Sequence, residues 1–170
     1  ACGWAAGAGA VKASAGVESY DFGNTTPLGE DLSEDLFSYD ITASWQATEK
    51  ILVEAMGKNG MQPAAQYVAN TKEVTLASLG ASYDITKSWI LSLAGSWRYD
   101  DYRGKVEDPN DGSLRFKHRE LYGGRLRLDY KPSVNFFDLY AETTYEDSRT
   151  NIKDDYGNYD QLRIALGLAL

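Results

Sequence analysis

Charged residues recur at every second position of several strand-like segments of this sequence. In "RLRLDY", for example, Arg125, Arg127 and Asp129 alternate with leucine and tyrosine. Because successive side chains of a β-strand point to opposite faces, such charges gather on one face of a sheet. An unpaired buried charge is costly, so we expect ion pairs across a polar interior. The charges assigned to this interior are Asp40, Glu54, Asp84, Arg98, Arg125, Arg127, Asp129, Asp138, Glu142 and Arg163.

A polar interior of this kind has two uses. Eight strands enclose a space that side chains just fill, so the charges would form an ion-paired plug in place of a hydrophobic core. A charged lining that lets solutes pass needs a wider barrel. In either case we expect Arg125 and Arg127 to face inward, and at least one of them to pair with Asp138 or Glu142 of the following segment.

Residue types that carry out catalysis or bind metals are sparse. His118 has only Ser113 nearby and no further catalytic partner, so we interpret it as a solvated loop histidine. The stretch "EDPNDGS" breaks the alternate-residue ligand order of a calcium loop and is predicted to form a turn. With one cysteine, Cys2, the chain has no internal disulfide, and lipidation of Cys2 is left open. The sequence thus predicts no catalytic residue, no metal and no cofactor.

Eight segments show the two-residue alternation of β-strands, and none shows a sustained helical period. They span residues 10–22, 36–47, 50–59, 72–85, 88–102, 118–131, 134–147 and 159–170. Short links fall at 47–49, 85–87 and 131–133, and long polar links at 23–35, 60–71, 103–117 and 148–158. Equal three-residue turns would set Gln46 opposite Lys50 and Asp84 opposite Ser88. The pattern predicts antiparallel hairpins in a single domain, residues 1–170.

The face opposite the charges is apolar, with aromatic residues near the strand ends. In "WILSLAGSWRYD", Trp89, Leu91, Leu93 and Trp97 share this face, as expected of a strand that crosses a membrane and both of its interfaces. The last segment, "LRIALGLAL", has the same alternation with Arg163 on its polar side. The aromatic residues expected at the two membrane interfaces are Tyr39, Trp45, Tyr83, Trp89, Trp97, Tyr99, Tyr122, Tyr130, Phe137 and Tyr145.

Composition agrees with a barrel and excludes other classes. The 170 residues carry a net charge of -8, which argues against nucleic acid as a partner. Mean hydropathy is -0.44. No run of about 18 apolar residues is present, so the sequence predicts no spanning helix. Alternating barrel strands need only about 10 residues each and escape that criterion.

The segments "SWQATEKILVEAMGKNG", "LASLGASYDITKSWILSLAGSWRYDDY" and "RLRLDYKPSVNFFDLYAETTYED" resemble the beta-barrel porin type 2 family of Gram-negative outer membranes. The resemblance covers residues 36–170 and implies no catalytic residues. Members of the family are usually longer, so the chain resembles either a compact eight-stranded relative or the C-terminal part of a larger barrel.

We therefore expect an all-β fold, an antiparallel up-and-down transmembrane β-barrel of eight strands with both termini in the periplasm. It would be structural or let small solutes and ions pass. The expected partners are outer-membrane lipids, lipopolysaccharide and the barrel assembly machinery. Two alternatives stay open: a soluble lipocalin-like binding barrel with the apolar face inward, and a membrane-embedded lipid-modifying barrel enzyme.

Overall fold

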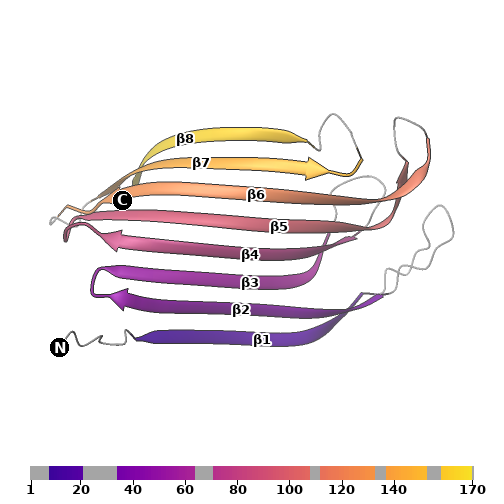
Figure 1. Cartoon of the computed structure of the whole chain (residues 1–170), viewed down its shortest axis with the longest axis horizontal. Helices are drawn as coiled ribbons and strands as arrows, with labels where there is room; N and C mark the ends of the chain where they lie inside the picture. Colours follow the sequence, from indigo (N-terminus) through magenta and orange to yellow (C-terminus); the bar gives the residue numbers. More distant parts are fainter. Residues whose placement is uncertain are drawn as a thin grey trace, which may run out of the picture.

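The fold is all-β, an up-and-down sheet of eight antiparallel strands. In the computed structural model, residues 8–20, 34–63, 71–107, 112–132, 137–152 and 158–169 are described. Each strand pairs with its neighbour in sequence, in the order β1 to β8 (Figure 1). The strands are β1 (Gly9–Tyr20), β2 (Glu34–Thr48), β3 (Ile51–Pro63), β4 (Thr71–Asp84), β5 (Trp89–Glu107), β6 (Leu114–Tyr130), β7 (Asp138–Thr150) and β8 (Tyr159–Ala169).

The strand count agrees with the sequence prediction, but several boundaries do not. Residues 103–117, predicted as a loop, are mostly strand, because β5 runs on to Glu107 and β6 begins at Leu114. The strand signal in this part of the hairpin is short, since only Leu114 and Phe116 alternate with Arg115 and Lys117. Strand β7 spans 138–150 and not 134–147. Cys2 and residues 108–111 of the "EDPNDGS" turn lie outside the described residues.

Two predicted registers are wrong by two residues. Gln46 lies opposite Leu52 and not Lys50, because an irregularity between Gln46 and Thr48 enlarges the turn. Asp84 lies opposite Ile90 and not Ser88, because five residues and not three separate the paired positions. A shift of two positions leaves every side chain on its predicted face, so the alternation survives the error.

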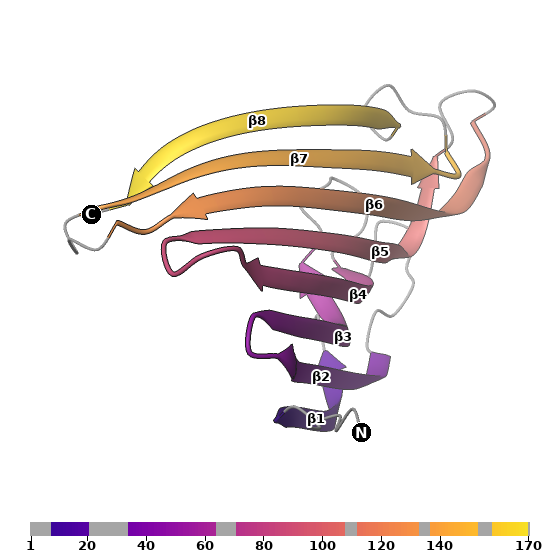
Figure 2. The same ribbon diagram turned by 60° about the vertical axis from the view of Figure 1, so that its left-hand side comes forward.

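The sheet is open in this structure. Strands β1 and β8 form its two edges and do not pair with each other in the described residues. In both views the two edge strands lie at opposite sides of a strongly twisted sheet (Figures 1 and 2). Closure into a barrel is therefore not part of the observed fold.

The polar face of the sheet is its concave face. Side chains from strands that are not neighbours meet there: Gln62 of β3 accepts a hydrogen bond from Arg98 of β5 at 3.5 Å, and Glu18 of β1 accepts one from the backbone N–H of Met61 in β3 at 3.0 Å. A hollow of about 450 Å³ on this side is bordered by residues from β1 to β6, including Lys12 and Arg125.

No extended hydrophobic core lies beneath the described part of the sheet. The buried apolar residues gather near the ends of the strands that lead to the long links, and they are Met61, Val74, Tyr102 and Ile152. Large apolar side chains along the middle of the convex face are exposed instead: Leu79 at 62%, Leu93 at 61% and Leu166 at 82%. Contiguous exposed apolar surface on this scale marks an interaction surface for a membrane or a protein.

Candidate functional site

The predicted interior charges share the concave face of the sheet. The cross-strand register forms one row through Glu54, Gly80, Ala94, Arg125 and Thr144, and this row continues to Arg163 on β8. Since partners in register point to the same side, the register assigns the other predicted charges to the concave face as well: Asp40, Asp84, Arg98, Arg127, Asp129, Asp138 and Glu142.

Arg127 on β6 is the centre of one ion-pair cluster on this face. Its guanidinium donates to Asp129, with Nη2 to Oδ1 at 2.8 Å, and to Glu142 of β7, with Nη1 to Oε2 at 3.4 Å. The expected pairing of Arg125 or Arg127 with Asp138 or Glu142 is thus confirmed for Arg127 and Glu142. The nearer partner is Asp129, two positions along the same strand. Both carboxylates stabilise the charge of the guanidinium group, and the hydrogen bonds to Asp129 contribute more than the one to Glu142.

The aromatic ring of Tyr140 packs against the arginine of this cluster. The guanidinium of Arg127 lies 4.2 Å from the centre of the Tyr140 ring, within the range of a cation–π contact. The Tyr140 ring in turn lies over Gly167, its cross-strand partner on β8, and occupies the space that a Cβ on Gly167 would need. Any larger residue at position 167 would therefore have to displace the Tyr140 ring.

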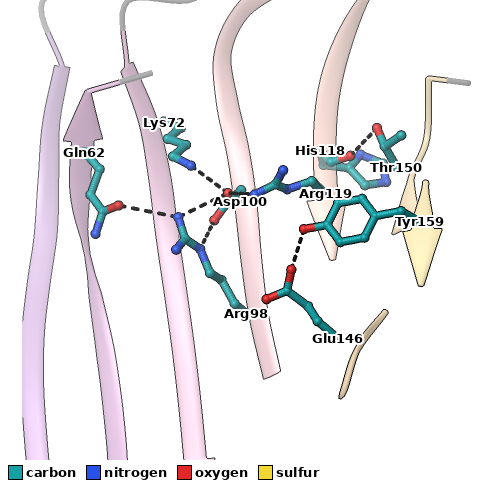
Figure 3. A network of polar contacts seen from close by, with 9 residues as sticks. All are labelled: Gln62, Lys72, Arg98, Asp100, His118, Arg119, Glu146, Thr150 and Tyr159. Carbon is teal, nitrogen blue, oxygen red and sulfur yellow. Dashed lines mark hydrogen bonds and ion pairs between the residues drawn. The ribbon is translucent and has the colours of Figure 1, made fainter. Parts of the chain in front are cut away.

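A second cluster surrounds Asp100, whose side chain is fully buried (Figure 3). Its Oδ1 accepts from Arg98 Nε at 2.5 Å, and its Oδ2 accepts from Lys72 Nζ at 2.7 Å. Arg98 Nη2 at 3.3 Å and Arg119 Nη2 at 3.5 Å approach the same Oδ2. Strands β4, β5 and β6 thus place three cationic side chains around one carboxylate.

Electrostatics keep Asp100 ionised. The residue lies on β5, three positions beyond Trp97. Burial alone would raise the pKa of the Asp100 carboxyl, but hydrogen bonds from Arg98 and Lys72, together with their charges, outweigh burial and lower the pKa below its ordinary value. One buried nitrogen, Arg119 Nε, has no hydrogen-bond partner among the side chains described.

The convex face has aromatic residues in two rows. The register assigns nine of the ten predicted interface aromatics to this face: Tyr39, Trp45, Tyr83, Trp89, Trp97, Tyr99, Tyr122, Tyr130 and Tyr145. Phe137 directly precedes β7 and is exposed. On four strands the two rows lie eight residues apart, in the pairs Phe37 and Trp45, Trp89 and Trp97, Tyr122 and Tyr130, and Phe137 and Tyr145.

Both rows are inclined to the strands by the same amount. Through successive cross-strand partners, Trp97 of β5 aligns with Ile41 of β2, four residues from Phe37. The other row shifts by the same amount, since Trp45 of β2 aligns with Leu93 of β5, four residues from Trp89. With about 3.3 Å per residue and about 4.8 Å between strands, the shift corresponds to a tilt of roughly 40°.

Sequence reasoning missed the partners that lie two positions apart on one strand. Arg98 with Asp100, Arg127 with Asp129 and Arg149 with Asp147 all follow this spacing. Two residues of opposite charge separated by one position point to the same face, so the signal was present in the sequence. The contributions of Lys72 and Arg119 to the Asp100 cluster were missed because they depend on register across β4, β5 and β6.

The prediction for His118 is wrong. The residue belongs to β6 and not to a loop, and its ring stacks on Tyr99 of β5 with centroids 5.8 Å apart. Ser113 lies five residues away along an extended chain and accepts a hydrogen bond from Arg115, so it does not form a catalytic pair with His118. Among the described residues, no group of three or more potential ligands is arranged to hold a metal.

No family model, curated protein or solved structure matches this chain. The resemblance to the beta-barrel porin type 2 family therefore stays a prediction from sequence patterns. No helix long and apolar enough to cross a membrane occurs among the described residues.

Proposed function

We propose that the chain forms a transmembrane β-barrel of the bacterial outer membrane, with a polar, ion-paired lumen that is structural or passes small solutes and ions. The observation that carries this proposal is the pair of aromatic rows on the convex face, with an exposed apolar band between them. Membrane barrels have such a band, flanked by aromatic residues at both interfaces.

The dimensions of the band support the proposal. Eight residues span about 26 Å along a strand, which is roughly 20 Å along the membrane normal at a tilt of about 40°. Spanning strands tilt by about 35–45°, and the apolar band of outer-membrane barrels is about 25 Å tall. Two parallel aromatic rows that are inclined to the strands at this angle are expected for a membrane barrel and not for a soluble sheet.

The two alternatives have less support. A lipocalin-like binding barrel requires its apolar side chains on the concave face, where Arg98, Arg125 and Arg127 lie instead. A lipid-modifying enzyme requires a nucleophile and a base close together, and His118 stacks on Tyr99 away from Ser113. The short turns would face the periplasm with both termini, and the longer links would face outward, as in other outer-membrane barrels.

Closure of the barrel is part of the proposal, because a membrane leaves no unpaired strand edge. From β2 to β7 the aromatic rows shift by six residues over five strand steps. Over the eight steps of a closed barrel this amounts to a stagger of about 10 residues, an even number as alternation requires. Cross-strand partners align Ala13 with Asp160, so a stagger of this size pairs Val17 with Leu166.

Expression with an export signal tests the proposed location. We expect the protein in the outer-membrane fraction, extractable only by detergent, and with a gel mobility that changes on heating because a closed barrel resists unfolding. Single-channel recording then measures passage, for which we expect small or no conductance. A protein that is stable and monomeric in buffer without detergent would falsify the membrane proposal.

A cysteine pair tests the closure. In a Cys2→Ser background, Val17→Cys with Leu166→Cys should form a disulfide within one chain, whereas Val11→Cys with Leu166→Cys should not. A disulfide between two chains would show that a second copy completes the barrel. Failure of both pairs to react would reject the proposed meeting of β1 and β8.

A further inference from the structure

The Asp100 cluster has more hydrogen-bond donors than Asp100 can satisfy. Each carboxylate oxygen has about two lone-pair sites. Oδ2 of Asp100 is approached by three donors, from Lys72 at 2.7 Å, Arg98 at 3.3 Å and Arg119 at 3.5 Å. The longest of these distances belongs to Arg119, whose Nε donates to no described group. The guanidinium of Arg119 is therefore the least engaged of the three cations.

Among the described residues that form its ion pairs, the cluster has an excess of positive charge. Lys72, Arg98 and Arg119 contribute three positive charges around the carboxylate of Asp100. Their side chains are 13%, 30% and 23% exposed, so each reaches both the carboxylate and the open concave face. Partial burial strengthens the attraction of such a group for an anion, since solvent screens it less than on an open surface.

We propose that Lys72, Arg98 and Arg119 form a binding site for a small oxyanion, such as a free phosphate or a carboxylate-bearing solute, on the concave face beyond the aromatic row that contains Trp97. Asp100 orients the three cations and neutralises one of their charges, and the anion accepts the donors that remain. Guanidinium groups present paired donors that match the oxygens of phosphate and carboxylate. The assignment to a free solute rests on the proposed barrel, because its lumen would be open to water and closed to lipid.

Inorganic phosphate is the probe. Isothermal titration of the whole folded chain in detergent should show one phosphate bound per chain, weakened by added salt. Arg119→Gln should raise the dissociation constant by about tenfold or more, the effect of losing one charge-assisted hydrogen bond. Lys72→Gln, which leaves both guanidinium groups in place, is a second variant in case Arg119→Gln does not fold. Arg149→Gln is the matched control, because Arg149 lies on the convex face and pairs with Asp147.

The outcomes separate this inference from the proposed function. Folded protein that enters membranes but binds no phosphate, or loses binding equally in Arg149→Gln, would overturn the anion site alone. Phosphate binding that is sensitive to Arg119→Gln, in a protein that does not enter membranes, would support the site and reject the barrel. Where wild-type protein conducts, chloride should permeate better than sodium, and a preference for sodium counts against the site.

Discussion

Replacement of Leu93 by arginine distinguishes a membrane barrel from a soluble sheet. Leu93 lies on the convex face, 61% exposed, four residues from Trp89 and four from Trp97. Its cross-strand neighbours on this face are Ala81 and Leu126. In the proposed barrel the side chain therefore sits in the middle of the apolar band, about 10 Å from either aromatic row along the membrane normal.

The two environments predict different costs. In water, a substitution at a site this exposed usually changes the free energy of unfolding by no more than about 0.5 kcal/mol. In a bilayer, arginine on the lipid-facing side of a barrel costs about 2–4 kcal/mol near the midplane. We expect the higher value for Leu93→Arg, because no acidic side chain of a neighbouring strand lies opposite position 93.

Folding into phosphatidylcholine vesicles, titrated with urea, measures the difference. The matched control is Ser78→Arg, at a similar depth on the concave face, where Ser78 borders the hollow and its partners are Met56 and Ser96. We expect Ser78→Arg to cost less than Leu93→Arg by at least about 1 kcal/mol. Wild-type stability for Leu93→Arg in vesicles, or an equal loss for both variants, would refute the assignment of the convex face to lipid.

The remaining predictions concern the two ion-pair clusters. Arg127→Leu leaves two partly buried carboxylates unpaired and should lower the free energy of unfolding by about 1–3 kcal/mol. Arg149→Leu, at an exposed pair, should lower it by less. Adding Glu142→Leu to Arg127→Leu should recover part of the loss, measured in thermal melts. Gly167→Val should displace the Tyr140 ring, which contacts Arg127, and should lower the melting temperature more than Ala165→Val does. Because the folded pKa of Asp100 is lowered, its stabilising effect is present above its unfolded pKa of about 3.9 and is lost as pH falls through the folded pKa. Asp100→Asn should therefore flatten the loss of thermal stability between about pH 5 and pH 2, and an unchanged slope would contradict this.

Alternation alone was enough to predict the strands and their two faces. It depends on a period of two, which errors of two residues in register do not disturb, so the assignments at Gln46 and Asp84 kept their faces. It failed where the alternation is short. At the start of β6 only Leu114 and Phe116 alternate with Arg115 and Lys117, so the predicted strand began at His118 and the residues before it were assigned to a loop.

The Asp100 cluster shows the limit of local reasoning more sharply. Arg98 and Asp100 are two positions apart, and their contact follows from the sequence. Lys72 and Arg119 come from strands on either side, 28 and 19 residues away. They reach Asp100 only because the registers place Arg119 directly opposite Asp100 and Lys72 two residues from the position opposite it, on the same face. A one-residue slip in either pairing would turn one of these cations to the other face.

The direction of curvature, which decides between a membrane barrel and a soluble binding barrel, also has a cause in the sequence. A sheet bends toward the face whose side chains are smaller, because large side chains crowd on a concave surface. Between its charges the concave face has small residues, such as Ser78, Gly80, Ala94 and Gly123, and a Cβ on Gly123 would approach Ser96 Oγ to 2.5 Å. Along the described strands, the convex face has the tryptophans and most of the leucines and tyrosines. The difference in side-chain volume therefore favours the bend that turns the charges inward and the apolar band outward, and a variant series that enlarges the small concave residues should weaken closure before it disturbs the pairing of neighbouring strands.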